Sequence, residues 1–154
     1  MIAYIGSFLI LLAFLNALLL ITSKPILSKI TVDYESIVLS SSKLLFPLTL
    51  FSFICLIFSF LLDDFSLRYV SSNSNSLLPD HYKISATWAG HEGSMLLWCL
   101  VLSFWTFLAS IYSRNLDLDF RLNFLSIMGL LNLGFLAFLI FTSNPFEKNM
   151  SIPV

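Results

Sequence analysis

Four long apolar stretches without charged residues alternate with polar segments along the 154-residue chain. The stretches cover residues 2–22, 44–62, 93–112 and 122–142. Each is long enough to cross about 30 Å of hydrocarbon as a helix that rises 1.5 Å per residue. Backbone polar groups in lipid must be satisfied within their own segment, which favours helices. The pattern predicts an all-α polytopic membrane protein with four transmembrane helices, and residues 1–154 as a single membrane unit.

Composition supports a membrane protein and excludes several other classes. Hydrophobic residues make up 58% of the chain and charged residues 11%, with a mean hydropathy of +0.91. Soluble chains have about 25% charged residues, so this chain has too little charge to cover a globule. A net charge of −1 excludes a strongly basic nucleic-acid binder. Cys55 and Cys99 have no CxxC spacing, which excludes a zinc ribbon, and we interpret both as buried apolar residues.

Three details of the apolar stretches bear on the structure. The first stretch lacks a basic flank and a convincing cleavage site, so we expect a membrane anchor and not a signal peptide. Pro47 is expected in the first turn of the second span, where a missing N–H costs little. Gly129 and Gly134 permit close helix approach, but we favour ordinary membrane-helix composition as their explanation.

Lys and Arg residues suggest an orientation in the membrane. The segments 23–43 and 113–121 carry five of them, and the opposite side carries Arg68, Lys83 and Lys148. The positive-inside rule then puts both termini and residues 63–92 on the outer side. Segment 23–43 mixes apolar and charged positions, so we expect it to form a short amphipathic helix at the inner interface.

Polar and aromatic residues concentrate in segment 63–92, which is longer than a tight turn requires. It includes Asn73 and Asn75, and we expect it to lie on the membrane surface. Aromatic side chains anchor segments at the level of the lipid headgroups, and the expected anchors are Tyr69, Tyr82, Trp88 and Trp98.

The run from Trp88 to Trp98 leads from a small polar turn into the third span. Gly90 and Gly93 permit close backbone approach. Glu92 or Ser94 can satisfy free N–H groups at the helix start, and a carboxylate there also complements the helix dipole. For Glu92, helix capping and contact with a partner are equally good interpretations.

The two histidines are the residues with the most chemical potential. An imidazole at His91 can ligate haem iron or transfer a proton, but a hydrogen bond to Glu92 or to backbone is the favoured interpretation. His81 is interpreted as a solvated loop residue. The sequence has no phosphate-binding glycine loop, zincin motif or nucleophile elbow, so we expect no catalytic residue and no metal site in this chain.

Several motifs occur together in one order. They are Tyr69-Val70, Asn73-Ser74-Asn75-Ser76, Leu78-Pro79, Tyr82-Lys83, Ala86-Thr87-Trp88, His91-Glu92-Gly93-Ser94, Leu96-Leu97-Trp98 and Thr142-Ser143-Asn144-Pro145-Phe146. In this order the chain resembles the amino-terminal region of the CcmF family of cytochrome c-type biogenesis proteins. That family is the haem lyase component of cytochrome c maturation and includes the related nitrite-reductase assembly proteins.

The resemblance implies a function and partners. It implies a membrane protein that takes haem from the haem chaperone CcmE and attaches it to apocytochrome c. The implied location is the bacterial or mitochondrial inner membrane, with the chemistry on the outer side. The implied surface for haem or partner contact consists of Trp88, Gly90, His91, Glu92, Gly93, Ser94, Trp98, Asn73 and Asn75.

The chain also departs from the family. It lacks the family's tryptophan-rich WWD segment and the histidines around it, so we expect haem in an assembled complex and not on this chain alone. His91 remains a weak candidate for cofactor binding, and whether the chain takes part in catalysis stays open. We expect a split-gene product or a truncated copy, acting with the rest of the haem lyase. The alternatives are a small structural subunit of a respiratory or transport complex, or a non-functional remnant.

Overall fold

The computed structural model describes residues 1–22 and 33–149. Apart from one antiparallel bridge between Leu67 and Lys148, these residues form helices and turns. In chain order the elements are α1 (Ile2–Thr22), α2 (Tyr34–Leu61), α3 (Arg68–Asn73), α4 (Asp80–Ala86), α5 (His91–Tyr112), the 3-10 turn η2 (Ser113–Asn115) and α6 (Leu118–Thr142).

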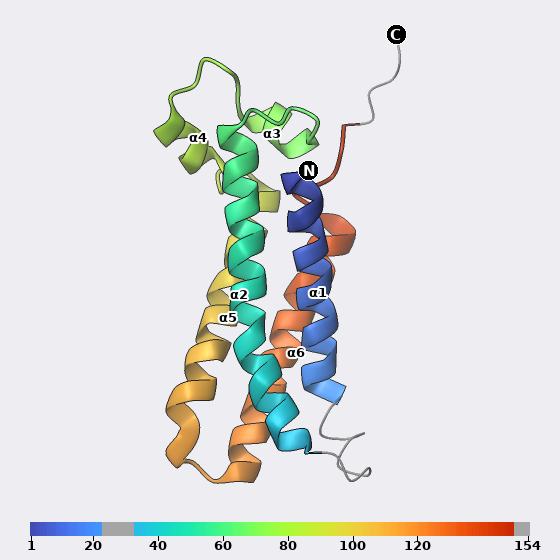
Figure 1. Ribbon diagram of the computed structural model, residues 1–154, viewed down its shortest axis with the longest axis vertical. Coiled ribbons are helices and arrows are strands. Elements are labelled where there is room, and N and C mark those ends of the chain that lie inside the picture. The colour runs from blue at the N-terminus through green and yellow to red at the C-terminus, as the bar shows by residue number, and fades with distance from the viewer. Residues whose placement is uncertain (23–32, 150–154) are drawn as a thin grey trace.

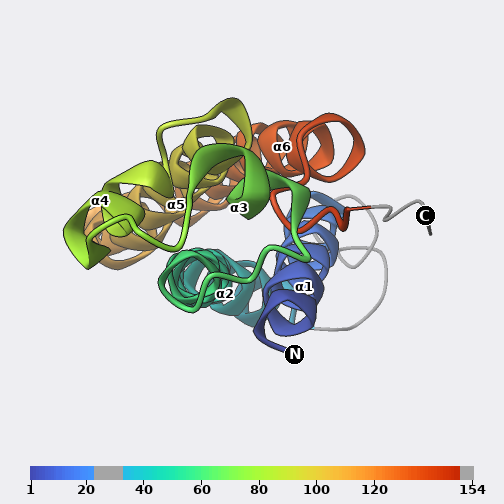
Figure 2. The same ribbon diagram turned by 90° about the horizontal axis from the view of Figure 1, so that it is seen from above.

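Helices α1, α2, α5 and α6 are each long and apolar enough to cross a membrane, and they form an upright bundle (Figure 1). Seen from above, α1 packs on α2 and α6, and α5 packs on the same two helices (Figure 2). The prediction of an all-α, multi-pass membrane protein is confirmed.

The two ends of the bundle differ. We call one the cap end: it holds residue 1, α3, α4 and residues 143–149 (Figure 1). The other is the hairpin end, where η2 joins α5 to α6. Residue 1, residues 143–149 and segment 63–92 therefore lie at the same end of the bundle, as expected for four crossings.

The second span begins earlier than the hydropathy pattern indicated. Asp33 caps α2 by accepting a hydrogen bond from the Ser36 N–H at 3.4 Å, and the helix continues for 28 residues. The prediction that Pro47 lies in the first turn is wrong, because the polar turns before residue 44 already belong to α2. Its missing N–H instead interrupts the hydrogen bonding of the helix interior.

The predicted interfacial helix over 23–43 is also not a separate element where the structure describes it. Residues 34–43 are the start of α2, and residues 23–32 lie outside the described residues. Helix α6 likewise begins four residues before the apolar stretch, because Asp117 caps it by accepting from the Phe120 N–H at 3.4 Å. Hydropathy marks the part of a helix suited to lipid, whereas capping residues mark where it begins.

Side-chain hydrogen bonds join the long helices inside the bundle. Lipid gives little hydrophobic drive for helix association, so packing and polar contacts must hold the helices together. The contacts run from Asn16 Nδ2 to the Ser41 carbonyl at 2.9 Å, between the Thr49 and Ser103 hydroxyls at 2.6 Å, from Ser52 Oγ to the Gly6 carbonyl at 3.0 Å, and from Asn132 Nδ2 to Thr106 Oγ1 at 2.9 Å.

Gly129 allows α1 and α6 to approach closely. A Cβ at this position would lie 2.7 Å from Cδ2 of Leu20, a side chain that is itself fully buried. The interpretation of Gly129 as ordinary membrane-helix composition is therefore wrong, because a larger residue would force the two helices apart. Of the two cysteines, Cys99 is buried as expected and Cys55 is half-buried.

Candidate functional site at the cap end

The cap end is fixed to the bundle by a buried ion pair. Helix α2 ends at Leu61, and Asp63 follows two residues later with a φ of 53°, a left-handed conformation that Asp tolerates better than most residues. Its Oδ2 accepts a hydrogen bond from Lys83 Nζ of α4 at 2.6 Å. The Lys83 side chain is only 5% exposed, so this charge depends on its partner.

Tyr69 of α3 holds the turn that leads into α5. Its hydroxyl donates to the Thr87 carbonyl and accepts from the Gly90 N–H, both at 3.0 Å. The side chain is 2% exposed and packs edge-on against Phe60 of α2 at 5.4 Å between ring centroids. Burial raises the pKa of the Tyr69 phenol above its usual range, which keeps the hydroxyl proton that it donates.

The two glycines of the turn are required by this packing. A Cβ at Gly90 would lie 2.6 Å from the Tyr69 ring. A Cβ at Gly93 would collide with the Thr87 carbonyl oxygen and lie 2.5 Å from the Tyr69 hydroxyl. The predicted close backbone approach at both glycines is confirmed: the partner is Tyr69 at Gly90, and the Thr87 carbonyl together with Tyr69 at Gly93.

The side chains between and beside the glycines are free to face outward. Helix α5 begins at His91, with Gly90 as its N-cap and without a side-chain capping hydrogen bond. The predicted cap by Glu92 or Ser94 is therefore wrong, and the Ser94 hydroxyl donates to the His91 carbonyl at 3.0 Å instead. Trp88 and His91 are exposed and Glu92 is half-buried in the first turn.

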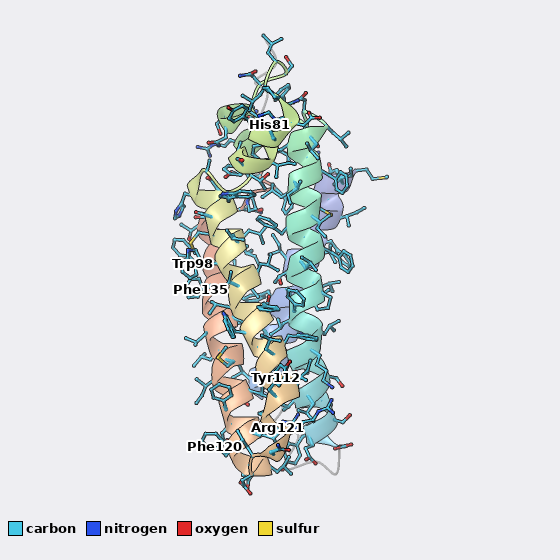
Figure 3. All side chains as sticks on the ribbon, turned by 90° about the vertical axis from the view of Figure 1, so that its left-hand side faces the viewer. His81, Trp98, Tyr112, Phe120, Arg121 and Phe135 are labelled. Atoms are coloured by element: carbon cyan, nitrogen blue, oxygen red, sulfur yellow. The ribbon has the colours of Figure 1, made fainter. Side chains whose placement is uncertain are left out.

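The remaining residues of the predicted contact surface lie at different distances from this turn. Asn73 belongs to it, since its Nδ2 donates to the Tyr69 carbonyl at 3.0 Å and its Oδ1 approaches Gly90. Asn75 is exposed in the next turn, where its Oδ1 accepts from the Leu77 N–H at 3.0 Å. Trp98 lies on a lateral face, about 10 Å further along α5 at 1.5 Å per residue (Figure 3).

Two other expectations for the cap end need correction. Tyr69 was expected to anchor the segment at the headgroups, but it is buried against α2 and the turn at Gly90. Tyr82, Trp88 and Trp98 remain exposed. His81 is exposed as expected, but it lies on α4 and not in a loop, with its ring 4.4 Å from that of Tyr82 (Figure 3).

Sequence reasoning missed the part played by residues 143–149. Phe146 packs on α1 so closely that a Cβ at Gly6 would lie 2.6 Å from its Cε1. The Arg68 N–H donates to the Glu147 carbonyl and the Asn149 N–H donates to the Ser66 carbonyl, both at 2.9 Å. The Asn144-Pro145-Phe146 motif was the available signal, and it locks the start of α1 to the start of α3.

His91 does not make the hydrogen bond that was favoured for it within the described part of the chain. Its ring contacts Phe138 of α6 edge-on, with centroids 6.0 Å apart, at the rim of an apolar groove. Met95 follows one turn later on the same helix face and also lines this groove. Two residues on one face of one helix cannot ligate opposite sides of a single iron, so His91 and Met95 do not form a two-ligand haem site.

The four-helix bundle and its cap end together define a class of protein. Within residues 1–22 and 33–149, no three His, Cys, Asp or Glu side chains gather as a metal site would require. At the cap end, buried hydrogen bonds of Tyr69 and Lys83 hold a turn with exposed aromatic and polar side chains. These features define a multi-pass membrane protein with a structured polar and aromatic surface at one end.

Comparisons with known proteins give the family. Residues 88–153 match the family described as Cytochrome C assembly protein. Over 103 residues, or 67% of this chain, it is 52% identical to the cytochrome c-type biogenesis protein CcmF of Pseudomonas fluorescens, and over 107 residues it is 47% identical to that of Escherichia coli. A solved cytochrome c heme lyase CcmF matches 96% of the chain with a TM-score of 0.85 and 28% identity.

The chain belongs to the CcmF family of cytochrome c-type biogenesis proteins. The matched segment spans only 16% of the length of these curated relatives, and the chain matches 25% of the solved structure. The resemblance drawn from the sequence motifs is confirmed.

Proposed function

We propose that the chain acts in cytochrome c maturation as the amino-terminal four-helix module of a membrane haem lyase. The observation that carries this proposal is the agreement of sequence and fold with CcmF proteins: 53% identity over 103 residues to that of Pseudomonas aeruginosa, and a TM-score of 0.85 over nearly the whole chain. The test is deletion of the gene, followed by haem staining of c-type cytochromes. Loss of holocytochrome c with apocytochrome still present is expected, and normal staining contradicts the proposal.

The proposed role of the cap end is contact and not catalysis. The two hydrogen bonds of the Tyr69 hydroxyl hold the backbone of the turn at Thr87 and Gly90. In the same turn, Trp88 and His91 are exposed and Glu92 is half-buried. A surface that is rigid before binding loses little conformational entropy when a partner arrives. The partners we propose are the haem chaperone CcmE, apocytochrome c and the tryptophan-rich part of the family architecture. Affinity purification of the chain from mild detergent should recover the tryptophan-rich segment with it.

The proposed location is the bacterial or mitochondrial inner membrane, with the cap end outside. The charge balance between the segments supports this orientation. In a Cys55→Ser/Cys99→Ser background, a membrane-impermeant thiol reagent should label Asn75→Cys in intact cells or organelles and Arg114→Cys only after permeabilisation. Both positions are exposed, so the pair is matched for access. The opposite labelling pattern reverses the orientation.

A further inference from the structure

An apolar groove of about 480 Å³ runs along one side of the bundle between α5 and α6. Its walls come from His91 and Met95 of α5 and from Leu130, Gly134, Phe135 and Phe138 of α6. From Leu130 to Phe138 it extends for about 12 Å at 1.5 Å per residue. Figure 3 shows Phe135 and Trp98 on the same side of the bundle in that view.

Gly134 is the feature that distinguishes this groove from an ordinary lipid-facing surface. At the other four glycines of the chain, a Cβ would come within 3 Å of a side chain or backbone atom of the same chain. A Cβ at Gly134 would meet no atom of the described residues within 4 Å, the neighbouring backbone of its own helix aside. Glycine inside a helix costs about 1 kcal/mol relative to alanine, and packing among the described residues does not offset that cost at Gly134.

An open glycine on a membrane-spanning helix is suited to close contact with another transmembrane helix. Small residues allow two helix backbones to approach closely in lipid, whereas an acyl chain adapts to a larger side chain equally well. The groove is apolar along its length, and its polar group, His91, lies at the cap end. This distribution matches a helix that is apolar within the membrane and polar at its boundary.

We infer that the groove seats a further membrane-spanning helix of the CcmF architecture, with a large apolar side chain over Gly134. The inference rests on the proposed function for the choice of partner. The solved CcmF relative supports that choice, because it contains the fold of 96% of this chain within only 25% of its own length. A larger membrane protein therefore exists in which this bundle has additional structure available to pack against it.

Photo-crosslinking in native membranes tests the inference. The full chain carries p-benzoylphenylalanine in place of Phe135 in the groove, and Phe120 of the same helix, 58% exposed and outside the groove, is the matched control. The expected result is an adduct at position 135 with a membrane-spanning segment of the CcmF architecture, identified by mass spectrometry, and none with that segment at position 120. An adduct only with lipid, an adduct with a second copy of this chain, or no adduct overturns the inference.

Two glycine variants make the test independent of folding. Gly134→Leu should not lower the melting temperature of the purified chain, since the position is open, and should reduce the adduct about tenfold through a loss of about 1.4 kcal/mol. Gly129→Leu should lower the melting temperature, because the new side chain meets Leu20. An undiminished adduct with Gly134→Leu contradicts the inference.

The outcomes also separate this inference from the proposed function. A lipid-only adduct together with loss of holocytochrome c on deletion overturns the helix seat and leaves the function in place. An adduct with the CcmF architecture together with normal holocytochrome c after deletion supports the helix seat and overturns the proposed function.

Discussion

The two ends of the bundle close their helices in different ways. At the hairpin end, Arg121 of α6 donates to the Ser110 carbonyl at 2.5 Å and to the Ser113 hydroxyl at 3.0 Å, which satisfies the end of α5 with residues close in sequence (Figure 3). At the cap end, Tyr69 and Lys83 join elements that lie about twenty residues apart, and residues 143–149 return to close the assembly. Joining two neighbouring helices requires only short-range contacts such as those at the hairpin end.

The difference between the two ends is consistent with the contact role that we propose for the cap end. Contacts between distant segments cost more chain entropy than a short turn, so they are expected where a defined surface has a use. At the cap end they hold the turn that presents Trp88, His91 and Glu92.

Replacing Lys83 by Met should have the largest effect, since it leaves the Asp63 carboxylate without its buried partner. We expect a loss of about 3 kcal/mol, at the lower end for such pairs because the Asp63 side chain is 26% exposed. Thermal unfolding in detergent measures it. The double variant Asp63→Asn/Lys83→Met should recover most of the loss, and Arg114→Met, exposed in η2, should be neutral. Wild-type stability of Lys83→Met would show that the pair does not hold the cap.

Gly93→Ala should be the next most destabilising change. Its methyl group meets the Thr87 carbonyl and the Tyr69 hydroxyl, and overpacking of this kind costs about 2 kcal/mol. Gly134→Ala is the matched control, because that position is open and alanine favours the helix. Equal melting temperatures for the two variants would mean that the turn at Gly93 is not tightly packed.

Tyr69→Phe should cost about 1–2 kcal/mol, because the Gly90 N–H and the Thr87 carbonyl both lose their partner. Burial raises the pKa of Tyr69, so the folded form holds its proton to higher pH than the unfolded chain, whose tyrosine titrates near pH 10. The hydroxyl contribution is complete below about pH 10 and is lost as the pH rises through the folded pKa. Unfolding measured at pH 7 and again above pH 10 should therefore show the gap between wild type and Tyr69→Phe narrowing. A difference in stability between wild type and Tyr69→Phe that widens above pH 10 would contradict the two hydrogen bonds of the Tyr69 hydroxyl.

The smallest effect is expected at the hairpin end. Arg121→Gln removes the bonds to the Ser110 carbonyl and the Ser113 hydroxyl at a cost of about 1 kcal/mol, with Arg114→Gln as the exposed control. Holocytochrome c should remain at the wild-type level in both. A larger loss of stability here than for Lys83→Met would reverse the contrast between the two ends.

The sequence predicted the parts of the fold that depend on local pattern. Uncharged stretches of about twenty residues located all four spans, and Gly90 and Gly93 marked a close backbone approach. The start of α2 was missed because its first turns are polar, and a hydropathy pattern does not distinguish such turns from a surface segment. Pro47 was placed wrongly for the same reason.

The interior of the cap end was not predictable, because its contacts join residues distant in sequence. By residue type alone, Tyr69 is expected to be a headgroup anchor and Lys83 a solvated charge. Only the packing of α3 and α4 against α2 buries them. The contact between the Phe146 ring and Gly6 joins residues that are separated by almost the whole length of the chain. A single sequence gives the residue types for such pairs, but it does not give the partners.

We propose that the buried residues of the cap end build a contact surface and that its exposed residues make the contacts. The most direct measurement compares holocytochrome c in cells carrying His91→Ala with that in wild type, together with the melting temperature of the purified chain. Because His91 is exposed, we expect an unchanged melting temperature and a reduced yield of holocytochrome c, with the haem absorption band of the assembled complex retained. A normal yield would contradict the contact surface. A His91-dependent Soret shift on the purified chain would instead make His91 a haem ligand and contradict the claim that it acts by contact.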